Sequence, residues 1–173
     1  MRSGAEIRRK AARIRMLLMD VDGVMTDGGV YYSARGLAMK RFHAHDGYGA
    51  VLCREAGLRL GMVSGRESPL VALRARDLGV DELLQGVADK HSVLAGLQAK
   101  YSLRREEFAY IGDDLFDLPL LGAVGLSGAP ADARKEVRGA VDYVCRQRGG
   151  EGALREFMDL IRGARRRTTG GAA

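Results

Sequence analysis

Tryptophan is absent from this sequence, and Phe, Trp and Tyr together make up only 6% of it. A core built mainly on aromatic rings is therefore excluded, and Leu, Val, Ala and Met must fill the interior. Glycine is abundant, at 24 of 173 residues, which favours frequent turns. With 46% hydrophobic and 29% charged residues, the chain fits one folded domain of the α/β class.

Few cysteines and short apolar runs restrict the setting of the protein. Cys53 and Cys145 lie far apart without the spacing of a metal site, so we expect two reduced thiols in the cytoplasm. No apolar stretch approaches the roughly 20 residues that cross a bilayer, so no membrane partner is expected. The run Met16–Met19 follows a basic segment, as in an export signal, but Asp20 ends it. We therefore predict a cytoplasmic protein.

The sequence is basic, with a net charge of +6. Part of the excess lies in two clusters, Arg8–Lys10 and Arg165–Arg167, which solvated ends of the domain explain best. The basic residues do not alternate with aromatic side chains that stack on bases, so no nucleic-acid partner is expected. A basic nucleic-acid-binding module remains the alternative to a site that attracts acidic metabolites.

Apolar runs alternate with helix-forming segments along the chain. Strands are expected over 14–21, 58–63 and 108–111, with shorter ones over 123–126 and 141–144. Helices are expected over 46–56, where Asp46 is the cap, and over 68–78, 90–100, 115–121 and 131–137. A hairpin is expected between residues 28 and 43. This alternation implies a mostly parallel sheet flanked by helices, which binds ligands beyond the carboxyl ends of its strands.

The strongest local signal is Asp20-Val21-Asp22-Gly23, directly after the first predicted strand. Asp20 and Asp22 leave that strand on the same side. Because two such charges repel unless a cation intervenes, the pair indicates a divalent metal, and oxygen ligands favour Mg²⁺ over zinc. An EF-hand loop fails as the explanation, since its twelfth position would be Tyr31 rather than Glu. Taken alone, Asp22-Gly23 is more often a simple turn.

Three further groups follow in order. Ser64 and Arg66 come after the second strand, Lys90 opens a helix, and Gly112-Asp113-Asp114 with Asp117 follows the third strand. Each is weak by itself, because Ser-Gly is usually a turn, lysine a solvated charge and an aspartate pair a helix cap. Their order along the chain is what discriminates.

With these four motifs between residues 20 and 117, the sequence resembles the haloacid dehalogenase (HAD) superfamily of phosphatases. The resemblance implies a Rossmann-like fold in which Asp20 is the nucleophile that forms an aspartyl-phosphate, and Asp22 is the acid and base. It also implies that Mg²⁺ is bound by the Asp20 carboxylate, the Asp22 backbone carbonyl and Asp113. Ser64 and Lys90 would bind the phosphoryl oxygens, in agreement with a reaction that depends on positioning and charge neutralisation.

Supporting roles are implied for two more aspartates. Asp114 and Asp117 would orient Lys90 or metal-bound water from behind the ligands. For Asp117, a charge on the surface of a helix is the alternative.

Within the superfamily, the sequence is similar to the 3-deoxy-D-manno-octulosonate 8-phosphate phosphatases over about residues 14–161. The matching segments are Arg41-Phe42, Asp46–Gly49, Val63–Arg66, Tyr110–Leu115 and Gly149–Glu156. The similarity implies hydrolysis of that sugar phosphate in lipopolysaccharide precursor synthesis, with Arg66, Asp46, Gly47 and Arg155 touching substrate. A guanidinium at Arg66 suits a carboxylate, although a structural salt bridge is the alternative. Related sialic-acid-type 9-phosphate phosphatases tend to carry an acidic residue there, which favours the octulosonate.

No large cap domain fits between the first two motifs. In the family resembled, the hairpins pack in a tetramer and a glycine-rich C-terminal segment closes the site, which implies a homotetramer with a hairpin flap at about 28–43 and a lid at about 146–156. A helix start with a flexible lead-in is the alternative for the lid. We expect a single domain over residues 1–163 and a disordered tail over 164–173.

Two other interpretations remain. His43 and His45 depart from the family pattern and are more often surface or packing residues than metal ligands. Rival functions are a phosphatase for another sugar phosphate, such as a sialic-acid-like 9-phosphate, or a non-catalytic binding subunit with this fold. Loss of Asp20 or Asp22 would favour the subunit, and both are present.

Overall fold

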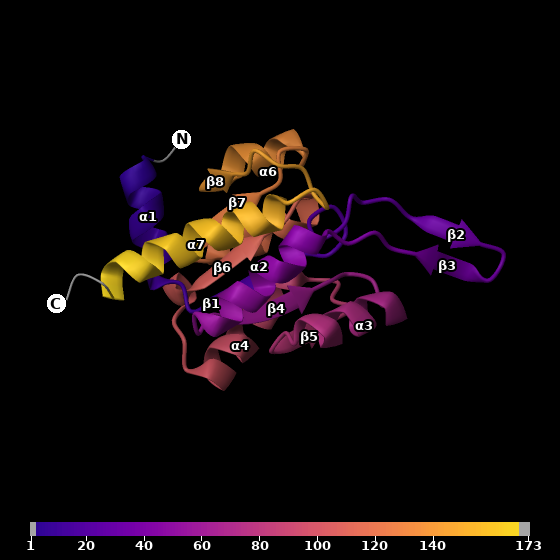
Figure 1. Cartoon of the computed structure of the whole chain (residues 1–173), viewed down its shortest axis with the longest axis horizontal. Coiled ribbons are helices and arrows are strands. Elements are labelled where there is room, and N and C mark those ends of the chain that lie inside the picture. Colours follow the sequence, from indigo (N-terminus) through magenta and orange to yellow (C-terminus); the bar gives the residue numbers. More distant parts are fainter. Residues whose placement is uncertain (1–2, 170–173) are drawn as a thin grey trace.

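A six-stranded parallel sheet, in the order β5-β4-β1-β6-β7-β8, forms the centre of the molecule (Figure 1). The computed structural model describes residues 3–169. The strands are β1 Met16–Met19, β4 Arg59–Val63, β5 Glu82–Leu84, β6 Phe108–Ile111, β7 Leu126–Ala129 and β8 Tyr143–Val144. The predicted α/β class and parallel sheet are therefore confirmed.

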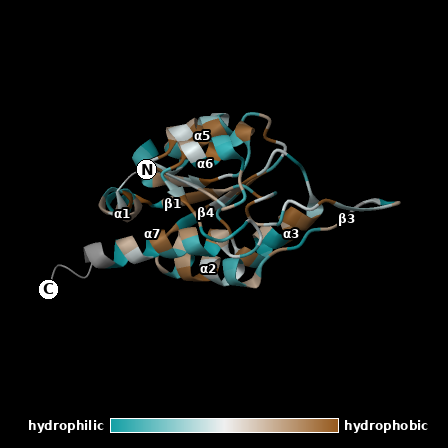
Figure 2. Ribbon diagram, turned by 90° about the horizontal axis from the view of Figure 1, so that it is seen from above, coloured by the Kyte–Doolittle hydropathy of each residue, from teal (hydrophilic) through white to brown (hydrophobic). Residues whose placement is uncertain are grey.

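Helices cover both faces of this sheet, as Figure 2 shows from above. They are α1 Gly4–Arg13, α2 Ala44–Glu55, α3 Pro69–Leu78, α4 Val93–Tyr101, α5 Leu118–Ala123, α6 Lys135–Ala140 and α7 Ala153–Thr169. One core packs α1, α2, α3 and α7 on one face, and a second core packs α4, α5 and α6 on the other. Along β1, Leu17 and Met19 enter the first core while Met16 and Leu18 enter the second, so this central strand is buried on both sides.

A small antiparallel hairpin projects from the body after β1 (Figure 1). Its strands are β2 Tyr31–Ser33 and β3 Gly36–Met39. At the base of the hairpin, Thr26 pairs with Phe42 in an isolated antiparallel bridge. Within residues 3–169, this hairpin is the whole insertion between β1 and α2, so the expectation of no large cap is confirmed.

Several predicted boundaries are wrong for local reasons. Helix α2 begins at Ala44 with His43 as its cap, so Asp46 lies inside the first turn and is not the cap. Strand β7 starts at Leu126, where its register with β6 begins, rather than at residue 123, which ends α5. Helix α6 starts at Lys135, after a turn that begins at Pro130.

Two further differences lie at an edge and at an end. Strand β5 was not expected, because it is a short, half-buried edge strand. Helix α7 packs against α1 and α2 and continues to Thr169, beyond residue 164 where the tail was expected to begin, and residues 170–173 lie outside the described part. None of the helices in residues 3–169 combines the length and apolar character that a bilayer crossing requires.

Candidate active site

Asp20 lies at the carboxyl end of the central strand β1. Its backbone N–H donates to the carbonyl of Ile111, 3.0 Å away, which fixes the residue beside the end of β6. Its side chain is only 3% exposed, and Oδ1 lies 2.6 Å from the ammonium of Lys90. The other oxygen, Oδ2, is buried and has no hydrogen-bond partner. One carboxylate oxygen is thus held by a cation while the second is available.

Lys90 is held between two carboxylates. It opens a 3₁₀ turn, Lys90–Ser92, whose cap is Asp89, and its side chain is 1% exposed. Besides Asp20, its ammonium contacts Asp117 Oδ1 at 2.8 Å. The ring of Phe116 lies over the same ammonium, 4.3 Å from nitrogen to ring centroid, which is a cation–π arrangement. Burial of a lysine is stabilised here by both ion pairs.

Asp117 faces inward, and the alternative of a surface charge is excluded. Its side chain is 0% exposed. Oδ1 accepts from Lys90 and from the Tyr110 hydroxyl, and Oδ2 accepts the backbone N–H groups of Asp113 (3.0 Å) and Asp114 (3.1 Å). The two oxygens together therefore accept from four donors, two each. These contacts position Lys90 and the loop after β6.

Carboxylate oxygens of Asp20, Asp113 and Asp117 lie within 4.8 Å of one another. Because Asp117 is fully engaged, the oxygens left for a cation are Asp20 Oδ2 and Asp113 Oδ1, both buried and without partners. Burial, followed by the charges of Asp20 and Asp117, raises the pKa of Asp113 to about 8. Burial likewise raises the pKa of Asp20 to about 6, against the lowering effect of Lys90. An all-oxygen, negatively charged pair of this kind fits a hard divalent cation such as Mg²⁺.

Gly23 permits this close approach of two loops. Its φ is +84°, a left-handed conformation, and a Cβ at this position would lie 2.1 Å from Asp113 Oδ2. A side chain would therefore be strained and would also displace the carboxylate. The glycine after the two aspartates is required by both geometry and packing.

A hollow of about 250 Å³ opens over Asp20. Its lining residues are Asp20, Asp22, Gly23, Gly28, Ser64, Gly65, Arg66, Asp113, Asp114 and Phe116. The structure thus brings together predicted residues from three strand ends. The Ser64 hydroxyl lies 3.0 Å from the Arg66 carbonyl, to which it donates, and it also accepts the Arg66 N–H, which shapes this turn.

Three predicted substrate residues lie outside this hollow, at the contact between α2 and α7. Asp46 is buried and its Oδ1 accepts the backbone N–H of Arg155 at 2.7 Å, a donor that the first turn of α7 cannot satisfy internally. Gly47 packs against Arg74. The Arg155 side chain pairs with Asp159 and lies over the ring of Tyr48. The contacts of Asp46 and Arg155 hold the C-terminal segment, and Gly47 packs α2 against α3; none of the three residues lines the hollow over Asp20.

The C-terminal glycines touch the first loop of the same chain. Gly150 N–H donates to the Val24 carbonyl at 3.0 Å. A Cβ on Gly149 would lie 1.8 Å from the Gly23 carbonyl oxygen, so only glycine fits there. Nearby, the His43 and His45 rings contact each other edge to face at 5.0 Å, and among residues 3–169 they belong to no cluster suited to a metal.

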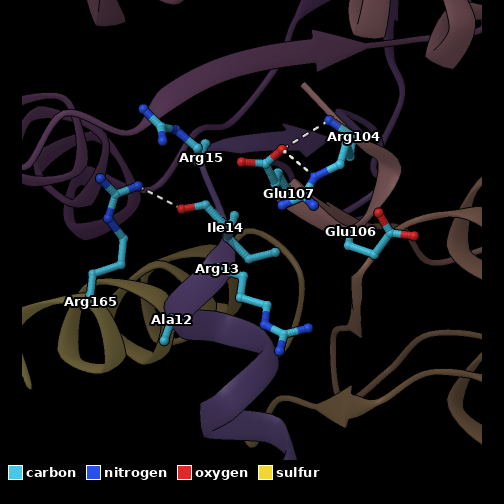
Figure 3. A pocket seen from close by; sticks show the side chains of 8 residues that line it. All are labelled: Ala12, Arg13, Ile14, Arg15, Arg104, Glu106, Glu107 and Arg165. Carbon is cyan, nitrogen blue, oxygen red and sulfur yellow. Dashed lines mark hydrogen bonds and ion pairs between the residues drawn. The ribbon is translucent and has the colours of Figure 1, made fainter. Parts of the chain in front are cut away.

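A larger hollow, of about 680 Å³, lies at the opposite edge of the sheet, where β1 and β6 begin (Figure 3). Figure 3 shows the guanidinium groups of Arg13, Arg15 and Arg104 pointing in different directions. Arg165 donates to the Ile14 carbonyl at 2.6 Å, and Arg104 pairs with Glu107. Arg165 and Arg104 thus contact different partners, and the size of a hollow alone does not identify a functional site.

Sequence reasoning missed three neighbours of the predicted residues. Lys40 pairs with Asp22, Tyr110 donates to Asp117, and Phe116 covers Lys90. A lysine at the base of a hairpin and a tyrosine inside an apolar strand carry no local signal of such contacts.

Comparison with known proteins agrees with this geometry. A family model for haloacid dehalogenase-like hydrolases matches residues 54–157. The 3-deoxy-D-manno-octulosonate 8-phosphate phosphatase of Haemophilus influenzae is 41% identical over 90% of this chain and 86% of that protein. The enzyme of the same name from Escherichia coli K12 is 40% identical over 91% of this chain and 84% of that protein.

Solved structures give the same result. The 3-deoxy-D-manno-octulosonate 8-phosphate phosphatase of Yersinia pestis has a TM-score of 0.91 at 41% identity, over 95% of this chain and 89% of that one. The Moraxella catarrhalis phosphatase of that name, in complex with magnesium ion, phosphate ion and a KDO molecule, has a TM-score of 0.92 at 35% identity, over 97% of both chains.

Proposed function

The chain belongs to the haloacid dehalogenase-like hydrolases, and from this premise we propose that it hydrolyses 3-deoxy-D-manno-octulosonate 8-phosphate to the free sugar acid and phosphate. The observation that carries the proposal is the buried Asp20, held by Lys90 on one oxygen and open on the other, beside Asp113. The substrate is inferred from similar proteins that match most of this chain.

The reaction proceeds in two halves on the side chains of one loop. In the first, an Asp20 oxygen bonds to phosphorus as the bond to the sugar oxygen breaks, and Asp22 gives that oxygen a proton. In the second, water bonds to phosphorus, its proton passes to Asp22, and the bond to Asp20 breaks. Asp22 is suited to this exchange because it lines the hollow and is more exposed than Asp20.

The surrounding residues neutralise and orient the substrate. Ser64 and Lys90 bind phosphoryl oxygens, with Lys90 held in place by Asp117. The Asp20 and Asp113 carboxylates, with the Asp22 carbonyl, would hold Mg²⁺, which would neutralise phosphoryl charge. Asp114 lines the hollow over Asp20, and we assign it to orienting water there.

Arg66 is the residue we assign to the sugar acid. It is exposed, lines the hollow and forms no ion pair among the salt bridges of the described residues, so its guanidinium is available for a carboxylate. We assign Asp46 and Arg155 to holding the C-terminal segment 146–156, which acts as a lid through its contacts with the first loop, and Gly47 to the packing of α2 against Arg74 of α3.

We further propose a homotetramer in the cytoplasm that serves lipopolysaccharide precursor synthesis. The hairpin exposes Tyr31, Tyr32 and Met39, a surface suited to packing against other copies over the site. Light scattering of the purified protein tests this assembly. The excess of basic residues serves acidic metabolites, and no nucleic-acid partner is proposed.

A panel of sugar phosphates assayed with and without Mg²⁺ tests the function. We expect Mg²⁺-dependent phosphate release that is fastest with the octulosonate 8-phosphate and slower with a sialic-acid-type 9-phosphate. Incubation with beryllium fluoride and Mg²⁺ should trap a phosphate mimic on Asp20. A preference for the 9-phosphate would replace the proposed substrate, and absence of turnover with every ester would refute the hydrolase.

A further inference from the structure

Lys40, at the base of the hairpin, contacts Asp22. The residue directly follows β3, and its ammonium donates to Asp22 Oδ1 in an ion pair. The Lys40 side chain is 2% exposed, although the neighbouring Met39 is largely exposed to solvent. Lysine is rarely buried unless it is paired, so this contact is a built feature of the site.

The hairpin base fixes the position of Lys40 independently of its own ion pair. On one side, Arg41 contacts the carboxylate of Asp27 at 3.0 Å. Next to it, Phe42 pairs with Thr26 in the isolated bridge. The bridge ties the returning strand to the loop that carries Asp22, so main-chain pairing places the Lys40 backbone, whereas the Arg41 ion pair is half exposed and contributes little.

The contact uses one oxygen of Asp22 and leaves the other. With Oδ1 held by Lys40, Oδ2 is the oxygen left for proton transfer, and Asp22 lines the hollow together with Asp20 and Arg66. A carboxyl group turns freely about its last bond unless such a partner holds it. Proton transfer needs the donor oxygen within hydrogen-bond distance of the leaving oxygen.

We propose that Lys40 is a positioning residue for proton transfer, which orients Asp22 toward the leaving oxygen of the substrate. This inference rests on the proposed phosphatase function. Before transfer, Asp22 carries the proton on Oδ2 while Oδ1 accepts from Lys40. The proton passes to the sugar oxygen as the P–O bond breaks, and Asp22 is then the carboxylate that pairs with the Lys40 ammonium. The same orientation serves the return of a proton from water to Asp22 in the second half.

The competing explanation is that the Lys40–Asp22 contact only stabilises the hairpin and has no role in proton transfer. Arg41 provides the matched control. Arg41 forms the same kind of ion pair from the same segment to the same loop, but to Asp27 rather than to Asp22. Replacing each by Met keeps an apolar stem and removes the charge. Thermal unfolding of both variants reports any shared structural effect.

The experiment compares two leaving groups. A sugar alkoxide leaves poorly without a proton, whereas the phenolate of 4-nitrophenyl phosphate needs none, and kcat/KM reports the steps up to that departure. For Lys40→Met we expect kcat/KM to fall about 10- to 100-fold with the sugar phosphate, within the range for general acid catalysis, and less than about threefold with the aryl phosphate. Arg41→Met should change both by less than about threefold, and Lys40→Arg should restore part of the sugar phosphate activity.

The outcomes separate this inference from the proposed function. An equal fall with both substrates, an equal fall in Arg41→Met, or an unchanged Lys40→Met would overturn the positioning role. If the unaltered protein hydrolyses another alkyl phosphate instead of the octulosonate ester, the proposed substrate is wrong and the same comparison is made with that ester. An unaltered protein that hydrolyses neither class refutes the phosphatase and the role of Lys40 with it.

Discussion

The two ends of the parallel strands differ in how far their charged side chains are buried. The carboxyl edge is the end where the strands finish, beside Asp20, and the opposite edge is the end where they begin, beside Arg15 and Arg104. At the carboxyl edge, Asp20, Lys90 and Asp117 are almost fully buried and contact one another, and Asp20 lines a hollow of about 250 Å³. At the opposite edge, the hollow is larger, about 680 Å³, but the Arg104 side chain there is 81% exposed and pairs with its neighbour Glu107 (Figure 3).

Burial of charged groups is the reason for placing the proposed reaction at the smaller hollow. Charges removed from water interact strongly and keep fixed positions, whereas exposed ion pairs are screened and contribute little. The carboxyl edge also retains carboxylate oxygens without partners, on Asp20 and Asp113, which a cation would satisfy. Converging buried groups, rather than volume, locate the chemistry of this fold.

The largest contrast should come from Asp20→Asn. The amide keeps the shape but is not a nucleophile, so we expect phosphate release to fall by at least about 10⁴-fold. Single-turnover phosphate release measures this, and unchanged thermal unfolding would show that the fold survives. A variant with near-full turnover would remove Asp20 from the reaction and with it the contrast between the edges.

Removal of the metal should have the second-largest effect on activity. The Asp20 and Asp113 pair needs a cation to be fully ionised, so EDTA should lower phosphate release by more than about 100-fold, with recovery on addition of Mg²⁺. Titration of Mg²⁺ back into the assay measures the effect. Full activity after exhaustive chelation would contradict the assignment.

The same pair predicts a pH dependence of stability. Folding raises the pKa of Asp113 to about 8 and of Asp20 to about 6, above their ordinary value of 3.8. Their contribution is therefore fully present below about pH 4 and is lost as pH rises toward about 8 in the metal-free protein. Because Mg²⁺ binds the ionised groups, the gap in Tm between Mg²⁺ and EDTA samples should widen from about pH 5 to about pH 8. The widening should shrink in Asp113→Asn, and a gap that narrows with pH would contradict the site.

Asp117→Asn and Glu107→Gln make the same chemical change at the two edges. Asp117 serves four donors, and an amide would turn its NH₂ toward two of them, so we expect a loss of about 3–5 kcal/mol of stability and about 10- to 100-fold of activity. Glu107→Gln should cost at most about 1 kcal/mol, because its partner Arg104 is exposed and the amide oxygen can still accept the Arg104 backbone N–H. Urea unfolding and kcat measure both. Equal losses of stability would mean that burial does not distinguish the edges.

Gly23→Ala tests the packing of the two loops. Its left-handed φ and the 2.1 Å approach of an added Cβ to Asp113 predict a loss of about 1–2 kcal/mol of stability. They also predict that half-maximal activity requires a roughly tenfold higher Mg²⁺ concentration. At Gly96, inside α4, an added Cβ would point into open space, so Gly96→Ala should be stabilising by about 0.5–1 kcal/mol. A Gly23→Ala protein with unaltered Mg²⁺ response would show that the loops tolerate separation.

The sequence predicted the carboxyl edge better than the details around it. Asp20, Ser64 and Asp113 were recognisable because each follows a buried strand, and parallel strands bring such ends together. For Asp117 the sequence left open an inward contact with Lys90 and a charge on a helix surface, because a 3₁₀ turn over Leu115–Asp117 sets its direction rather than any periodic pattern. Lys40 was missed because its partner is 18 positions away and depends on the path of the hairpin.

The smallest effects should come from the opposite edge. The sequence predicted solvated basic clusters near both ends, yet Arg165 is bonded to the Ile14 and Ala56 carbonyls and Lys10 pairs with Asp142, so parts of these clusters join elements together. Arg15→Ala and Arg104→Ala should still change kcat and KM by less than about twofold, because exposed charges so far from Asp20 are screened by salt. Steady-state assays at low and physiological ionic strength measure this. A tenfold change in either variant would mean that the two edges are coupled, and the division between a reactive and an inert edge would fail.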